Sequence, residues 1–104
     1  MNLQIISDDF KLDEKLTKFI EERFTQKIDK LLMDFDEDMK IATMRIEKGS
    51  RWGFKVNFDL MLPGKKHVYS DETGKNLQTT ILALRNEVMS QVKDYKEKLQ
   101  NTRD

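Results

Sequence analysis

Cations recur along two amphipathic stretches of this chain, at spacings that would bring them together on the surface of a helix. They are Arg23, Lys27, Lys30, Arg85 and Lys96. At 100° per residue, these side chains border the apolar stripe of each predicted helix. Such an arrangement suits the phosphates of a nucleic acid. It equally suits cations whose aliphatic stems cover the core, and the residues alone leave both interpretations open.

A second candidate lies in a turn between two predicted strands, where Arg51 precedes Trp52. An arginine beside an exposed aromatic ring can hold an unpaired base of RNA by stacking. A tryptophan in such a turn can also close the end of a hairpin against its neighbours. The sequence therefore offers Arg51 and Trp52 as RNA-binding candidates beside a purely structural interpretation.

Catalysis and metal binding are poorly supported by the residue types. The chain has one histidine, His67, and no cysteine, so no set of nucleophile, base and orienting group can be assembled. His67 also lacks a metal-ligand spacing, and we interpret it as an ordinary strand residue. Asp36, Glu37 and Asp38 lack the glycine and final glutamate of a calcium loop, which favours a solvated loop. We expect no enzyme, cofactor, metal or small-molecule substrate.

The bulk composition indicates one small domain. With 104 residues, 38% of them apolar, the chain has room for one core, and we expect a single domain over 1–104 with residues 100–104 as a short tail. The 19 basic and 19 acidic residues give a net charge of zero, which argues against a strong non-specific binder of nucleic acid. The absence of a long apolar run, and of cysteine, leads us to expect a cytoplasmic protein without a membrane anchor.

The candidate residues are positioned by elements that the apolar pattern predicts. Apolar and polar residues alternate over 54–62, as in a strand with one buried face, and Pro63-Gly64 ends it. Apolar residues recur every three or four positions over 14–32 and again over 77–100, where the stripe extends from Leu77 to Leu99. Asp13 and Asn76 are the expected helix caps.

Three further strands are predicted at 2–6, 39–48 and 68–72. The element order is then β-α-β-β-β-α, an α+β fold with a four-stranded sheet, both helices on one face and the other face open. This arrangement resembles a double-stranded-RNA-binding domain. The expected exposed residues of the open face are Ile41, Thr43, Lys55 and Met61.

Over nearly its whole length the chain also resembles the ribosome hibernation promoting factor family, known as well as the ribosome-associated inhibitor or sigma-54 modulation family. The resemblance rests on the order and spacing of several stretches. They are Leu-Asp-Glu-Lys-Leu at 12–16, Ile-Glu-Glu-Arg-Phe at 20–24, Leu-Pro-Gly at 62–64, Asn-Leu-Gln-Thr-Thr-Ile at 76–81 and Val-Met-Ser-Gln-Val-Lys-Asp-Tyr-Lys-Glu-Lys-Leu at 88–99. The family's fold has the element order deduced above.

The resemblance implies a short-form member that occupies the messenger and transfer RNA channel of the small ribosomal subunit and inhibits translation without catalysis. Its partners would be ribosomal RNA and possibly ribosomal proteins. By position, Arg23 corresponds to a basic residue of the family's first helix, and Lys93, Lys96 and Lys98 lie in its basic final helix. The alternative hypothesis is a protein-interaction module that uses the open sheet face and does not bind ribosomes.

Overall fold

The computed structural model describes residues 1–8, 11–49, 51 and 53–101, and these form the predicted α+β fold. The four strands are β1 (Asn2–Asp8), β2 (Ile41–Gly49), β3 (Gly53–Leu62) and β4 (Lys66–Gly74). The helical elements are α1 (Glu14–Ile20), the π-helical turn η1 (Glu21–Thr25), α2 (Gln26–Leu31), the 3-10 turn η2 (Glu37–Met39) and α3 (Leu77–Asn101). The order of strands and long helices confirms the prediction.

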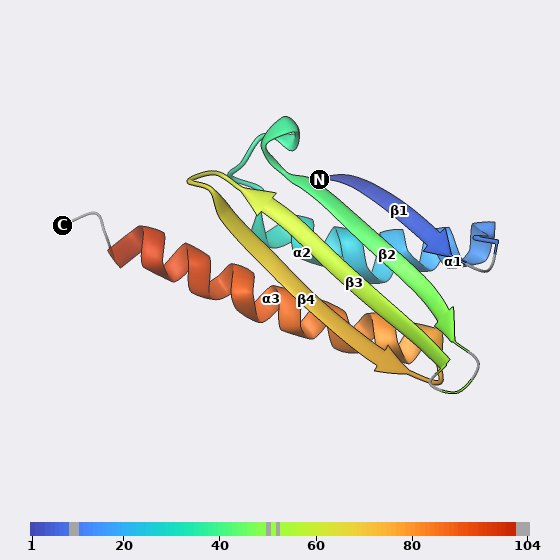
Figure 1. The fold of residues 1–104 in the computed structure, drawn as a ribbon. Coiled ribbons are helices and arrows are strands. Elements are labelled where there is room, and N and C mark those ends of the chain that lie inside the picture. Colours follow the sequence, from blue (N-terminus) through green and yellow to red (C-terminus); the bar gives the residue numbers. More distant parts are fainter. Residues whose placement is uncertain (9–10, 50, 52, 102–104) are drawn as a thin grey trace.

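The strands form one sheet in the order β1-β2-β3-β4. The pair β1 and β2 is parallel, whereas the β2-β3 and β3-β4 pairs are antiparallel. A parallel pair needs a long crossover, which the helical stretch from α1 to α2 supplies. Both helical stretches lie on the same face of the sheet (Figure 1), so the other face is left without a covering layer of helices.

The core lies between the sheet and the helices. The side chains of Val56, Phe58 and Leu60 on β3 are fully buried, as the alternating pattern predicts. The ring of Phe58 meets that of Phe24 edge to face, with 4.9 Å between the ring centroids. Ile81 on α3 is also fully buried in the same cluster. The strand at 54–62 is therefore the centre on which both helical stretches pack.

The first helical stretch begins where the sequence predicts but is not uniform. The backbone N–H of Leu16 donates to the carboxylate of Asp13 over 2.8 Å, which confirms Asp13 as the N-cap. After Ile20, five residues form the π-helical turn η1 before α2 resumes. The prediction of one regular helix over 14–32 missed this turn, because apolar spacing alone does not distinguish a widened turn within a helix.

Helix α3 is the longest element. The N–H of Thr79 donates to the side-chain oxygen of Asn76 over 2.9 Å, which confirms the second cap. The C-terminal part of α3 extends past the edge of the sheet (Figure 1). Leu99 is 43% exposed there, so including it in the buried stripe was wrong at this residue. Periodicity predicts which face of the helix Leu99 lies on, but it does not predict where the sheet that covers this face ends.

Candidate functional site

Two helical flanks carrying cations face each other on the outer side of the molecule. On α3, the buried residues Ile81, Leu84 and Val88 face the sheet. One flank of α3 contacts β4, since Gln91 donates to the carbonyl oxygen of Tyr69 over 2.8 Å. The helical periodicity places Arg85 on the opposite flank, which faces η1 and α2. The cations of these facing flanks, here called the helix seam, are Arg23, Lys27, Lys30, Arg85, Lys93 and Lys96.

Arg85 ties the two sides of the helix seam together. Its Nη1 donates to the backbone carbonyl oxygen of Arg23 over 3.2 Å, and its Nε and Nη2 donate to the side-chain oxygen of Asn86. The acceptor at Arg23 lies in the π-helical turn, where the regular hydrogen-bond pattern of the helix changes. A guanidinium has five N–H donors, so these contacts leave capacity for an anion. Arg85 therefore combines a structural contact with a charge at the surface.

The lysines of the helix seam are less constrained. Lys27, Lys30 and Lys93 are exposed, while Lys96 is half-buried with its ammonium 4.0 Å from a carboxylate oxygen of Asp34. A contact this long between exposed groups adds little stability. Contacts within the molecule therefore constrain these side chains little.

Met89 occupies the same flank of α3 as Arg85. It is half-buried and packs against the core cluster. A flexible apolar side chain at this place fills the contact between helices and adds no charge.

The remaining predicted RNA-binding residues lie away from the helix seam. Lys98 lines a small pocket with Lys66, Gln91, Asp94 and Tyr95, on the flank of α3 that contacts β4. Arg51 is exposed in the turn between β2 and β3. Trp52 lies outside the described residues. Of the nine predicted residues, Arg23 and Arg85 are joined by a hydrogen bond, and helical periodicity places four more cations on the same two flanks. Lys98 and Arg51 lie on two other surfaces.

A buried lysine that sequence reasoning did not single out lies at the start of β2. Only 3% of Lys40 is exposed. Its ammonium lies 3.0 Å from Glu37, 3.5 Å from Asp29 and 3.3 Å from the carbonyl oxygen of Leu32. The N-terminal ammonium of Met1 contacts the same two carboxylates. We call these four charged groups the acidic corner.

The contacts of the acidic corner shift the pKa values of Glu37 and Lys40. Hydrogen bonds from the N-terminal ammonium and from Lys40 hold the pKa of Glu37 below its usual value. Burial alone would lower the pKa of Lys40, but the hydrogen bond to Glu37 and the charges of Asp29 and Glu37 outweigh it and raise the pKa. Glu37 therefore belongs to an intramolecular ion-pair network, and the expectation of a simply solvated loop was incomplete. The sequence contains little indication of this network, because a single lysine before a strand does not reveal which carboxylates it contacts.

The open face of the sheet combines exposed apolar residues with surface ion pairs. Ile41 is 58% and Met61 39% exposed, and the two are direct neighbours across β2 and β3. Thr43 and Lys55 are half-buried, so the prediction that they are exposed was wrong for these two residues. His67 lies on β4 with its Nδ1 3.0 Å from Asp59.

Within residues 1–8, 11–49, 51 and 53–101, no three histidine, cysteine, aspartate or glutamate side chains gather in a way that would hold a metal ion. No helix in that part of the chain is long and apolar enough to cross a membrane.

Comparison with known proteins gives one family and a common fold. The sequence profile of the family described as "Sigma 54 modulation protein / S30EA ribosomal protein" matches residues 3–100. The N-terminal domain of Protein Y from Thermus thermophilus is 18% identical with a TM-score of 0.73, covering 91% of this chain and 99% of that one. A ribosomal subunit interface protein from Coxiella burnetii is 16% identical with a TM-score of 0.70, covering 93% and 99%. No curated protein matches the sequence.

Proposed function

The chain belongs to the sigma 54 modulation protein / S30EA ribosomal protein family, and we propose that it binds the small ribosomal subunit and inhibits translation. On this proposal it occupies the channel used by messenger and transfer RNA. Inhibition then follows from occupancy, because a bound protein and a bound RNA cannot fill the same space. No catalytic step is required.

The observation that carries the proposal is the helix seam. Six cations lie on the facing flanks of α3 and of the stretch η1 to α2, where Arg85 contacts Arg23, although the whole chain has no net charge. A partner rich in phosphate would gain from several such contacts at once, with release of its counterions. Because the acidic corner uses its carboxylates within the molecule, those charges are partly neutralised before a polyanion approaches.

The competing proposal is a protein-interaction module. It is favoured by the apolar residues Ile41, Met61 and Tyr69, which are exposed on the open sheet face. An apolar patch of this kind suits a protein partner better than it suits RNA. The two proposals use opposite sides of the molecule, so they can be separated by experiment.

A sedimentation profile of cell extract, probed for this protein, tests the proposal. We expect the protein in the fractions of small subunits and ribosomes, with part of it released at high salt because phosphate contacts are screened. Addition of the purified protein to a translation reaction should lower the yield in proportion to ribosome occupancy. A protein that stays at the top of the gradient at low salt, or that sediments with ribosomes without lowering translation, would overturn binding or inhibition respectively.

A further inference from the structure

A cavity at the end of the sheet where both helical stretches begin has no role in the function proposed above. Its volume is about 420 Å³, within the range of about 300–1,000 Å³ that small-molecule sites have. It is lined by residues from α1, β2, β3 and α3 and from the segment before α1. None of the cations of the helix seam contributes to it.

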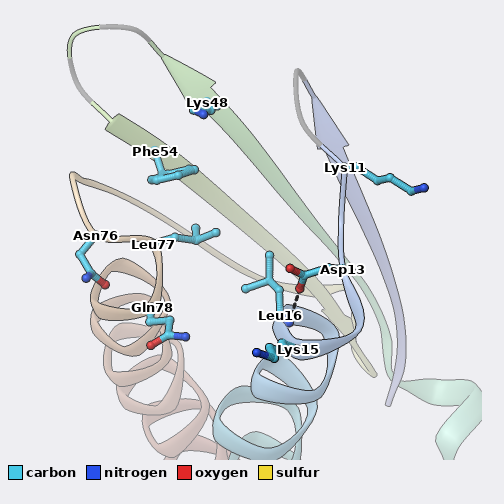
Figure 2. A pocket seen from close by; sticks show the side chains of 9 residues that line it. All are labelled: Lys11, Asp13, Lys15, Leu16, Lys48, Phe54, Asn76, Leu77 and Gln78. Carbon is cyan, nitrogen blue, oxygen red and sulfur yellow. Dashed lines mark hydrogen bonds between the residues drawn. The ribbon is translucent and has the colours of Figure 1, made fainter.

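The cavity has an apolar floor. Leu16 on α1, Phe54 on β3 and Leu77 on α3 are half-buried and lie on its inner side (Figure 2). Each of them also packs against the hydrophobic core, which holds their side chains in place. A flat, weakly polar group would find contact here with three different elements.

The rim of the cavity is cationic. Lys15 and Lys48 line it from α1 and β2, and both side chains are exposed. Lys11 also lines it, but its side chain extends away from the apolar floor (Figure 2). The one carboxylate in the lining is that of Asp13, which already accepts the N–H of Leu16 as the helix cap. The lining therefore has a formal charge of +2, three lysines less one aspartate, and it favours an anion.

Side-chain amides complete the lining. Asn76 and Gln78 lie at the start of α3, and Gln78 lies near Lys15, whereas Lys48 lies at the other end of the cavity beside Phe54 (Figure 2). An amide presents both a donor and an acceptor, as the polar edge of a nucleobase does. The lining thus combines apolar contact, amide hydrogen bonding and positive charge.

We propose that this cavity binds a nucleotide. The base would contact Leu16, Phe54 and Leu77, with Gln78 at its polar edge, and the phosphate would contact Lys48, which is the cross-strand partner of Phe54. A free nucleotide and the 5′-phosphorylated end of an RNA strand present the same chemistry, so the experiment includes both. The proposal does not depend on ribosome binding, because the cavity and the helix seam share no residue.

The test is a titration of the folded protein followed by amide NMR shifts. The probes are adenosine and guanosine monophosphate, a short RNA with a 5′ phosphate, the same RNA without it, adenosine, and inorganic phosphate. We expect saturable shifts at Leu16, Phe54, Leu77 and Gln78 with a monophosphate or with the phosphorylated RNA. Adenosine and inorganic phosphate alone should bind at least several-fold more weakly, because each supplies half of the contacts.

Matched variants assign the binding to the cavity. Lys48→Gln should weaken binding by about threefold, the effect expected of one exposed charge contact to a phosphate. Lys18→Gln/Lys66→Gln removes two exposed lysines outside the cavity and should leave the affinity unchanged. Both variants should stay folded, because exposed substitutions change stability little.

Several results would overturn the proposal. They are an absence of shifts around the cavity with every nucleotide probe, equal affinity for inorganic phosphate or adenosine, and equal weakening by the control variant. Ribosome sedimentation of Lys48→Gln would show separately whether subunit binding persists, so loss of one function is not mistaken for loss of the other.

Discussion

The two faces of the sheet are built from the same alternating strands. On the covered face apolar and charged side chains are buried or paired, whereas on the open face several of them are exposed. On the covered face, the apolar residues of β2 and β3 are buried, and Lys40 at the start of β2 is paired in the acidic corner. On the open face, Ile41 and Met61 remain exposed, and Arg45 forms an exposed ion pair with Asp8 over 3.1 Å. The side on which a residue lies therefore decides whether it stabilises the fold or remains available to a partner.

This difference shows that the residue type alone does not determine the role of a cation. Lys40 and Lys27 are both lysines next to apolar runs, yet one is buried with two carboxylates and the other is exposed on the helix seam. Burial makes the first a structural residue, because loss of its charge would leave its two carboxylate partners with the N-terminal ammonium as their remaining ion-pair partner among the described residues. Exposure leaves the second free to bind.

Phe58→Ala should have the largest effect on the covered face. Phe58 is fully buried and contacts Phe24, so its truncation should lower the free energy of unfolding by about 3–5 kcal/mol. A domain of this size has only about 5–15 kcal/mol of stability in total. Urea denaturation followed by circular dichroism measures the change. An unchanged midpoint would mean that β3 is not the centre of the core.

Lys40→Ala compares a buried cation with an exposed one. The substitution removes hydrogen bonds to Glu37, Asp29 and the carbonyl oxygen of Leu32. It should lower the free energy of unfolding by about 1–3 kcal/mol. Arg45→Ala, the matched change on the open face, should cost at most about 1 kcal/mol because its partner Asp8 is also exposed. Urea denaturation of both variants tests the contrast, and equal losses would contradict it.

Glu72→Gln should change how stability depends on pH. Glu72 lies on β4, and burial, reinforced by the charge of Glu87 on α3, raises its pKa above the usual 4.5. The folded state thus binds the proton of Glu72 more tightly than the unfolded state does. The resulting stabilisation of the fold is fully present below pH 4.5 and is lost as pH rises through the raised pKa. The variant should be more stable than wild type at neutral pH.

The advantage of Glu72→Gln should shrink as the pH falls to about 4, where wild-type Glu72 is protonated as well. Melting temperatures of both proteins from acid to neutral pH provide the measurement. A variant that is no more stable than wild type at neutral pH would show that Glu72 and Glu87 do not repel each other in the fold.

Met61→Ser should have the smallest effect. Met61 is 39% exposed on the open face, and its replacement should change stability by no more than about 0.5 kcal/mol. If the open face is not the ribosome-binding surface, the variant should also sediment with ribosomes as wild type does. Loss of sedimentation by a folded Met61→Ser protein would favour the interaction-module hypothesis.

Much of the fold could be predicted because it depends on local patterns. The alternation over 54–62 identifies the central strand, and the caps Asp13 and Asn76 mark where the two helical stretches begin. The π-helical turn and the exposure of Leu99 could not be predicted in this way. Both depend on which elements meet in space, and the apolar period contains no information on that.

The candidate site could be predicted only in part for the same reason. Periodicity places Arg23 and Arg85 beside the apolar stripes of their helices, but it does not predict the hydrogen bond that joins them across 62 positions of sequence. Lys98 belongs to the same basic helix as Lys96, yet it lies on the other flank. The contacts of Lys40 arise between segments that are distant from it in sequence, such as α2.

The most direct test of the proposed function is binding to purified small ribosomal subunits at several salt concentrations. The test variant is Lys27→Gln/Lys30→Gln/Lys93→Gln, and the control is Lys18→Gln/Lys65→Gln/Lys66→Gln, which replaces exposed lysines outside the helix seam. We expect the test variant to bind more weakly, with a log–log salt slope reduced by roughly 0.7–0.9 for each lost phosphate contact, and the control to match wild type. Equal affinities and equal slopes for all three proteins would contradict the assignment of the helix seam as the RNA-binding surface.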